Sequence, residues 1–248
     1  MGTLATLMDQ WLGRREAAPP AAGSREQLFM DQRRLAGASA GVVFDVGAQH
    51  GQNALQYYED FSQARIYAFE PAADNLARMR QSLAGKTDRI EVVEQALAEA
   101  PGEIEFNLNS HDGTHSRLPI GDTRYWQQPA TTLQQVKVAA TSIDAFMAER
   151  GLDNIDVLSM DIQGGELATL RGASQALAAG RIGLIALEVN FKPIYRDLPL
   201  FWDLGALLAG YGYNLFGLYD CVYAPDNANV LSWADALFVG PRHQKLNG

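Results

Sequence analysis

Short apolar segments alternate with amphipathic segments along most of the chain. The apolar segments predict buried strands at residues 42–46, 65–69, 90–93, 155–160, 182–189, 213–218 and 236–239. Apolar residues at helical spacing predict helices at residues 52–58, 75–83, 142–150, 165–177 and 201–209. Strands and helices that alternate in this way form an α/β fold, a mostly parallel sheet with helices on both faces.

Two segments depart from this alternation. Residues 102–109 have a period of two, which predicts an exposed strand, and residues 135–139 could pair with it. Residues 110–132 are irregular, rich in His, Asp, Gly and Thr, and long for a connection. Loops of this length in compact domains often cover or line a site, so we expect a binding loop here.

The first residues form a separate region. Apolar residues at helical spacing predict a short amphipathic helix at residues 4–11, followed by a linker rich in Pro and Ala and a second helix at 25–35. We therefore divide the chain into a helical extension at 1–40, a main domain at 41–241 and a tail at 242–248. The amphipathic segment could also support a homodimer.

Composition limits the class of protein. The chain has 248 residues, 47% of them apolar, and a formal net charge of −9. The acidic balance argues against a nucleic-acid partner, which needs a surface that neutralises phosphates. The single cysteine, Cys221, suits a reducing compartment, and no apolar run is long enough for a membrane span. These features predict a cytoplasmic enzyme or small-molecule binder.

The most specific chemical signal is the sequence Asp-Val-Gly-Ala-Gln-His-Gly at positions 45–51, between a predicted strand and a predicted helix. Glycines here let the backbone approach a ligand closely, at the sheet edge where doubly wound folds bind ligands. Glu70, at the end of the next strand, can accept hydrogen bonds from ribose hydroxyls. A dinucleotide fingerprint would need glycine where Gln49 stands, so a nucleoside without a pyrophosphate bridge is favoured. A plain turn in which Asp45 caps the helix is the alternative.

This turn resembles the glycine motif of class I S-adenosylmethionine-dependent methyltransferases. The sequence Asp-Ile-Gln-Gly-Gly-Glu at 161–166, followed by Leu-Arg-Gly-Ala at 170–173, narrows the resemblance to the FkbM family. Further matches are Phe69-Glu70-Pro71, Ser142-Ile143-Asp144, Leu187-Glu188-Val189 and residues 234–239. The resemblance spans about residues 42–240. It implies a Rossmann-like methyltransferase domain with a seven-stranded, mostly parallel sheet whose last strand is antiparallel.

The resemblance also implies where the cofactor, S-adenosylmethionine, binds. The implied cofactor residues are Asp45, Gly47, Ala48, Gln49, His50 and Gly51 in the turn, Glu70 and Pro71 at the ribose, Gln95 and Ala96 beside the adenine, and Asp161 beside the methionine amino group and the reacting methyl.

Methyl transfer to a hydroxyl is assisted by a group that takes up the acceptor's proton. The candidates are the strand-end acids Asp161 and Glu188 and the loop histidines His111 and His115. Asp161 is favoured because its place at a strand end is rigid. Asp161, Glu188 and Asn190 also offer oxygen ligands for Mg²⁺, so metal dependence stays open.

The expected reaction is O-methylation of a hydroxyl on a small-molecule or glycan acceptor, namely a sugar, a glycolipid or a secondary metabolite. N-methylation of a peptide or amide side chain is an alternative that the same cofactor site could serve. A nucleoside- or NAD-binding protein without methyl transfer is the alternative from another class, and the residue at position 49 weighs against NAD. The Asn/Asp-Pro-Pro-Tyr/Phe motif of base-directed enzymes is absent after the fourth core strand.

Overall fold

The computed structural model of the chain describes residues 23–122, 130–224 and 227–243. The helices in these ranges are α2 (Arg25–Ala36), α3 (Gln52–Asp60), α4 (Ala73–Ser82), α5 (Ile143–Arg150), α6 (Glu166–Arg171), α7 (Ser174–Ala178) and α8 (Phe201–Gly210), with a 3₁₀ turn η1 (Asp112–Thr114). The strands are β1 (Val42–Val46), β2 (Arg65–Phe69), β3 (Ile90–Val93), β4 (Ala96–Leu97), β5 (Gly102–Asn109), β6 (Thr132–Thr141), β7 (Ile155–Met160), β8 (Ile182–Asn190), β9 (Asn214–Ala224) and β10 (Asn227–Val239).

The central sheet of the described chain has seven strands, in the order β3-β2-β1-β7-β8-β10-β9. Strands β1, β2, β3, β7 and β8 pair in parallel, and β10 runs antiparallel to both of its neighbours. The predicted seven-stranded sheet with an antiparallel last strand is confirmed. The strand order reverses between β1 and β7, which places a ligand crevice at the carboxyl ends of these two strands.

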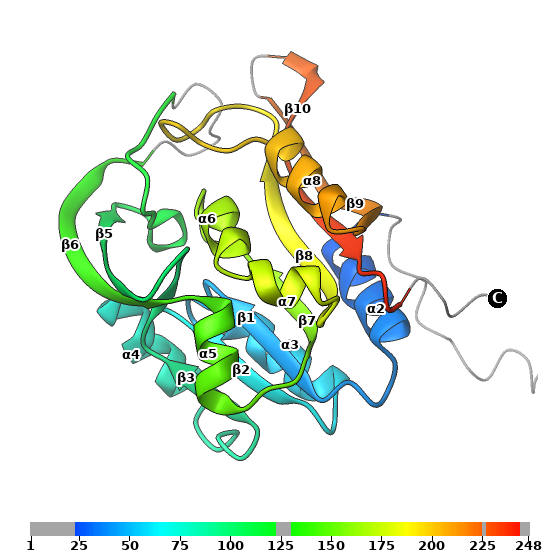
Figure 1. Cartoon of the computed structure of the whole chain (residues 1–248). Coiled ribbons are helices and arrows are strands. Elements are labelled where there is room, and N and C mark those ends of the chain that lie inside the picture. Colours follow the sequence, from blue (N-terminus) through cyan, green and yellow to red (C-terminus); the bar gives the residue numbers. More distant parts are fainter. Residues whose placement is uncertain (1–22, 123–129, 225–226, 244–248) are drawn as a thin grey trace, which may run out of the picture.

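Helices cover both faces of the sheet (Figure 1). Helices α2, α3 and α4 pack on one face through side chains such as Leu28, Tyr57 and Met79, and α5 to α8 pack on the other. The second face holds a cluster of aromatic rings whose centroids lie 4.9 to 5.5 Å apart, formed by Phe44, Tyr67, Phe69 and Phe146. This cluster fixes β1 and β2 against α5, directly below the crevice.

The predicted helix at 165–177 is interrupted, which corrects the sequence interpretation. It forms two short helices, α6 and α7, that meet at Gly172 and Ala173. A β-carbon at Gly172 would lie 2.2 Å from the carbonyl oxygen of Ala98, so the chain passes tightly against the segment after β4. The carboxylate of Asp144 then accepts hydrogen bonds from the backbone N–H groups of Gln175 and Ala176, both at 2.9 Å. These contacts start a new helix, because the first N–H groups of a helix need acceptors.

A second, three-stranded sheet, β4-β6-β5, extends from the edge of the domain that carries β3 (Figure 1). The predicted pairing of residues 102–109 with 135–139 is confirmed as the antiparallel pair β5–β6. The described part of the segment that follows β5, residues 110–122 and 130–131, is irregular as expected, apart from η1 and two isolated bridges, Asn107–Ser116 and Ile120–Tyr195. Strands β9 and β10 are longer than predicted and form one antiparallel pair.

The predicted helix at 4–11 and most of the linker lie outside the described residues. The second predicted helix is α2, and polar contacts to β9 and β10 attach it to the sheet. The guanidinium of Arg25 lies 3.3 Å from the carboxylate of Asp235, and the hydroxyl of Tyr219 donates to Asp31 at 3.0 Å. None of the helices in the described ranges is both long and apolar enough to cross a membrane.

The aromatic cluster predicts a large mutational effect on stability. Phe146 is 1% exposed, and Phe146→Ala leaves a cavity between α5, β1 and β2. We expect this variant to lower the free energy of unfolding by about 3–5 kcal/mol in denaturant titration. The control Leu133→Ala, at a side chain that is 71% exposed, should change it by less than about 0.5 kcal/mol. A similar effect of both substitutions would contradict the packing described here.

Candidate active site

A cavity opens at the carboxyl ends of β1, β2 and β7. Eight of the sequence-predicted site residues line it, namely Gly47, Gln49, Glu70, Pro71, Gln95, Ala96, His115 and Asp161. The other six predicted residues lie around this lining rather than in it, namely Asp45, Ala48, His50, Gly51, His111 and Glu188.

The turn after β1 is held between the two neighbouring strands. The N–H groups of Gly47 and Ala48 donate to the carbonyl oxygen of Phe69 in β2, at 3.0 and 2.9 Å. On the other side, the N–H of Asp161 donates to the carbonyl of Val46 at 3.0 Å. Gly47 has φ 78°, and a β-carbon there would lie 2.0 Å from the carbonyl oxygen of Asp161. Only glycine fits this position, because it tolerates the positive φ and has no side chain.

Glu70 faces the cavity with both carboxylate oxygens fixed. One accepts a hydrogen bond from the backbone N–H of Gln49 at 3.0 Å, and the other from the N–H of Ala72 at 2.8 Å. The side-chain amide of Asn75 also donates to this carboxylate. Glu70 is 4% exposed, and burial raises its pKa to about 7, although these hydrogen bonds oppose the rise. The remaining lone pairs can accept hydrogen bonds from a ligand's hydroxyls.

Asp45 supports the turn from behind. Its side chain is 1% exposed and accepts hydrogen bonds from the side chain of Asn53 and the backbone N–H of Ala54, at the start of α3. Burial raises the pKa of Asp45 to about 7. Gly51, in a left-handed conformation, begins α3 at the other end of the turn. This geometry makes Asp45 a residue that positions the turn.

Two acidic side chains meet at the ends of β7 and β8, with the amide of Gln163 between them. The Nε2 of Gln163 donates to Asp161 at 2.8 Å and lies 3.3 and 3.4 Å from the two oxygens of Glu188. The side chain of Asp161 is exposed to the cavity, whereas Glu188 reaches it through Gln163. Burial, and then the carboxylates of Asp161, Glu166 and Asp235, raise the pKa of Glu188 well above its usual value.

The arrangement of these acids does not fit the Mg²⁺ site that the sequence left open. The amides of Gln163 and Asn190 donate hydrogen bonds to Glu188, so they occupy lone pairs that a cation would need. Within the described ranges, no three His, Cys, Asp or Glu side chains come close enough together to hold a metal ion. The residues present therefore give no support to a metal-dependent step.

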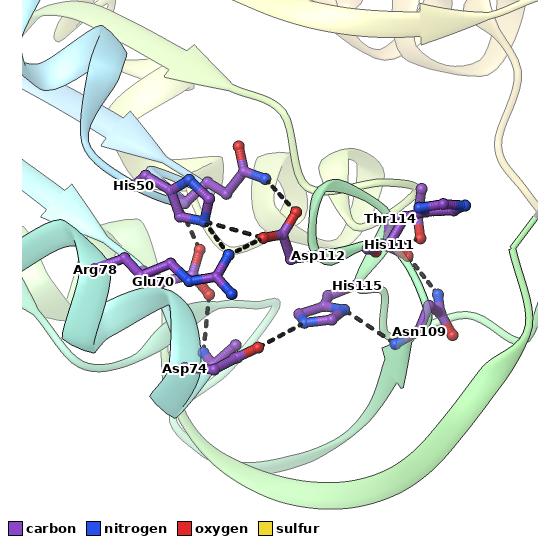
Figure 2. Close-up of polar contacts among 11 residues, drawn as sticks. His50, Glu70, Asp74, Arg78, Asn109, His111, Asp112, Thr114 and His115 are labelled. Carbon is purple, nitrogen blue, oxygen red and sulfur yellow. Dashed lines mark hydrogen bonds and ion pairs between the residues drawn. The ribbon is translucent and has the colours of Figure 1, made fainter. Parts of the chain in front are cut away.

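A strap, which we define as residues 111–117, crosses the cavity beside the turn (Figure 2). Its Asp112 lies 2.6 Å from the guanidinium of Arg78, 3.1 Å from Nε2 of His50, and accepts a hydrogen bond from the Gln49 amide at 3.1 Å. Partial burial raises the pKa of Asp112, but the charges of His50 and Arg78 outweigh this and hold it below its usual value. The strap is thus attached to the turn after β1 and to α4 by one carboxylate.

The strap places its two histidines differently. His111 is exposed and lies outside the cavity lining, whereas His115 is 8% exposed and lines the cavity. The Nδ1 of His115 accepts a hydrogen bond from the backbone N–H of Asn109 at 3.0 Å (Figure 2). In the neutral ring the proton therefore sits on Nε2. This geometry favours His115 as a hydrogen-bond donor.

One tyrosine connects the strap to the acids. The hydroxyl of Tyr195, which is 1% exposed, lies 2.8 Å from Oε1 of Gln163 and 3.2 Å from the carbonyl of Thr114. The same Gln163 amide contacts Asp161 and Glu188 through its other end. Gln163 has φ 52°, a conformation that non-glycine residues rarely adopt and that is typical of functional sites. The strap and the acids therefore form one connected network.

Several residues of this site had no role in the sequence interpretation. They are Asn75, Ile104, Phe106, Asp112, Arg117, Gln163 and Tyr195. Two signals could have found some of them. Gln163 lies inside the 161–166 motif, and Asn75 is a polar residue on the apolar face of a helix, next to Leu76.

Comparison with known proteins identifies the family. The sequence profile described as "Methyltransferase FkbM domain" matches residues 45–215, more than half of the chain. The chain belongs to the FkbM methyltransferase family. The resemblance inferred from the motifs at 45–51 and 161–166 is thereby confirmed. The prediction that the protein is an S-adenosylmethionine-dependent methyltransferase is confirmed as well.

Curated relatives and a solved structure agree with this assignment. The 2-O-methyltransferase NoeI of Sinorhizobium fredii is 27% identical over 169 residues, which span 64% of this chain and 68% of the relative. The 31-O-demethyl-FK506 methyltransferase FkbM of Streptomyces tacrolimicus is 26% identical over 208 residues, 74% of this chain and 76% of the relative. The FkbM methyltransferase structure from Methylobacillus flagellatus KT superposes with a TM-score of 0.52 at 18% identity, over 82% of this chain and 44% of that chain, and supports the fold.

The residues present fit the methyl donor of this family. Gly47 lines the cavity and holds the turn close against the end of β7, and the fixed carboxylate of Glu70 offers acceptors for two ribose hydroxyls. The cavity wall also carries apolar side chains, such as Leu97 and Phe106, against which a flat base can pack. When bound, S-adenosylmethionine supplies an activated methyl group on a positively charged sulfur.

The close contact at Gly47 predicts a loss of donor binding. In Gly47→Ala the new β-carbon collides with the Asp161 carbonyl, so the turn must shift. We expect the affinity for S-adenosylhomocysteine to fall at least about 100-fold in calorimetric titration, equivalent to roughly 3 kcal/mol. Gly37→Ala is the matched control, because Gly37 has φ 77° but a β-carbon at this position would have nothing within 4 Å. Gly37→Ala should lower stability without changing the affinity for S-adenosylhomocysteine. Equal affinity of the two variants would show that the close approach of Gly47 to Asp161 is not needed for binding.

The raised pKa of Glu70 predicts pH-dependent binding. The ionised carboxylate accepts hydrogen bonds from ribose, and protonation removes part of this capacity. Because the pKa is about 7, affinity for S-adenosylhomocysteine should be full above pH 8 and fall as the pH drops below 7. Calorimetry from pH 5.5 to 8.5 tests this. Glu70→Gln should bind about 10–100-fold more weakly at pH 8 and show a flatter profile. An unchanged slope in the variant would assign the titration to another group.

Proposed function

We propose that this methyltransferase transfers its methyl group to a hydroxyl oxygen of a sugar or secondary metabolite. The observation that carries the proposal is the carboxylate of Asp161, exposed to the cavity at a strand end and adjacent to the cofactor turn. A hydroxyl acceptor must lose its proton as the new bond to carbon forms, and a carboxylate at hydrogen-bond distance can receive it.

The surroundings of Asp161 suit that role. Its partly desolvated position in the cavity raises the pKa of Asp161 above the usual value, while the Gln163 amide and the charge of Arg25 oppose the rise. A carboxylate with a raised pKa is a stronger base and shares a proton more readily. Its backbone is hydrogen-bonded to β1, so its position relative to the turn is fixed, and fixed alignment is a large part of catalysis in a displacement reaction.

The relatives point to the same acceptor class. The names of two of them, 2-O-methyltransferase NoeI and 31-O-demethyl-FK506 methyltransferase FkbM, state or imply transfer to oxygen. The two enzymes methylate different positions. The relatives therefore support oxygen as the methylated atom, and the identity of the acceptor molecule is left to experiment. A small-molecule or glycan acceptor also agrees with the net charge of −9, which disfavours polyanionic nucleic acids.

The test is methyl transfer from radiolabelled S-adenosylmethionine to a panel of acceptors. The panel contains deoxyhexosides, uronic acids, hydroxylated macrolides and, for the N-methylation alternative, peptides and primary amides. We expect labelled methyl ethers, and we expect Asp161→Asn to lower kcat by about 10²–10⁴-fold at saturating donor. Asp153→Asn is the matched control, because Asp153 is an exposed acid just before the start of β7. This variant should retain activity. Methylation of nitrogen alone would overturn the proposal.

A further inference from the structure

One positively charged side chain that lines the cavity has no partner. Arg117, the last residue of the strap, is half-buried, and among the described residues its guanidinium makes neither a hydrogen bond nor an ion pair. By contrast, His50 and Arg78, which lie near the other end of the strap, are both paired with Asp112. A guanidinium is always protonated, and a charge that is partly removed from water is normally paired. Arg117 is therefore a candidate to bind an anion that enters the cavity.

The backbone around Arg117 is fixed against the segment that follows β7. The hydroxyl of Ser116, which is 0% exposed, donates to the carbonyl oxygen of Gln163 at 2.6 Å and accepts the N–H of Leu118 at 2.8 Å. On the other side, Leu118 packs so closely on Gly164 that a β-carbon at Gly164 would lie 2.7 Å from its Cδ1. Both neighbours of Arg117 therefore hold it beside this segment.

Gly165 leaves the space that the Arg117 side chain uses. A β-carbon at Gly165 would lie 3.6 Å from Cδ of Arg117 and 3.0 Å from Cδ1 of Ile162. Gly165 has φ −85°, so its backbone conformation does not require glycine. The missing side chain instead makes room for the stem of the arginine. Arg117 and Gly165 line the cavity together with Asp161, so the guanidinium belongs to the same part of the wall as the proposed proton acceptor.

The chemistry of a guanidinium determines which group it binds. Its planar fork of N–H donors matches the oxygens of a carboxylate or a phosphate, which it can bind through two parallel hydrogen bonds. The methyl donor is placed at the turn after β1 and at Glu70, after β2, so the wall formed by the segment after β7 is left to the acceptor. In that part of the cavity the carboxylates of Asp161 and Glu188 repel an anion, whereas Arg117 attracts it.

We propose that Arg117 binds an oxyanion of the acceptor, a carboxylate or a phosphate, while the hydroxyl that is methylated lies at Asp161. The preferred acceptor is then an acidic molecule, such as a sugar acid or a sugar phosphate, and not a neutral one. This inference rests on the proposed function through the place of the hydroxyl at Asp161. A neutral acceptor would displace water and leave the guanidinium unpaired, which lowers affinity. The opposite charges of Arg117 and Asp161 also orient an acidic acceptor, because its anionic group is attracted by one and repelled by the other.

The experiment compares acceptor fragments that differ in one group. The full chain, with S-adenosylhomocysteine bound, is titrated at pH 8 with two pairs of ligands, and binding is followed by saturation-transfer NMR. One pair is methyl β-D-glucuronide and methyl β-D-glucoside, and the other is glucose 6-phosphate and glucose. We expect at least one acid to bind about tenfold more tightly than its neutral counterpart, and the two pairs show which oxyanion is preferred. Equal affinity within both pairs, or no binding of either acid, would overturn the inference.

Three variants assign the preference to the guanidinium. Arg117→Gln should reduce it to about twofold or less, and Arg117→Lys, which keeps the charge without the planar fork, should retain part of it. Arg171→Gln, at an exposed arginine at the far end of α6, is the matched control and should keep the wild-type preference. If Arg117→Gln weakens binding of S-adenosylhomocysteine as much as that of the acids, the guanidinium pairs with the carboxylate of that ligand and the inference fails.

These outcomes separate the inference from the proposed function. The titrations contain no methyl donor, so a failure of methyl transfer to oxygen does not affect them. Equal methylation of neutral and acidic hydroxyl compounds in the acceptor panel would support the proposed function and overturn this inference. Methylation of nitrogen alone, with the preference for acids intact, would overturn the proposed function and leave Arg117 as the residue that binds the anion. The comparison of ligand pairs uses the wild type, so it decides even where a substitution prevents folding.

Discussion

The close approach of Gly47 to the carbonyl of Asp161 is the constraint on which the site depends. It brings the turn after β1 against the end of β7 with no space for a side chain. Hydrogen bonds from the turn to Phe69, and from Asp161 to Val46, hold the same three strands in register. The turn after β1, the acid that follows β2 and the carboxylate that follows β7 therefore form a single rigid unit.

This unit concentrates negative charge in a region with little solvent. Asp45, Glu70 and Glu166 all have pKa values raised to about 7 by burial. Arg25 approaches from α2, which lies outside the matched family domain, and opposes the rise at Asp45. Keeping several carboxylates in one place disfavours their ionised forms, and a positively charged sulfonium ligand would relieve that repulsion. The electrostatics of the site thus suit a cationic donor.

The sequence was informative where the structure is local. The turn at 45–51 and Glu70 follow strands, so their positions at the sheet edge can be predicted from the pattern of strand, glycine and helix. Contacts between distant segments could not be predicted in this way. Asp144, in α5, accepts the first N–H groups of α7 from 31 residues away, and Asp112 reaches Gln49 from a loop with no regular pattern. The position of the strap is determined by side-chain contacts such as those of Asp112. It therefore leaves no periodic pattern in the sequence, unlike the strands.

Tyr195 gives the network a further consequence. Its hydroxyl lies within hydrogen-bond distance of both the strap at Thr114 and the amide of Gln163, which separates the two acids. In the proposed site, a displacement of the strap would break this contact and release the Gln163 amide from its place between Asp161 and Glu188. Binding of the nucleoside and alignment of the acceptor would therefore be coupled through one hydroxyl group.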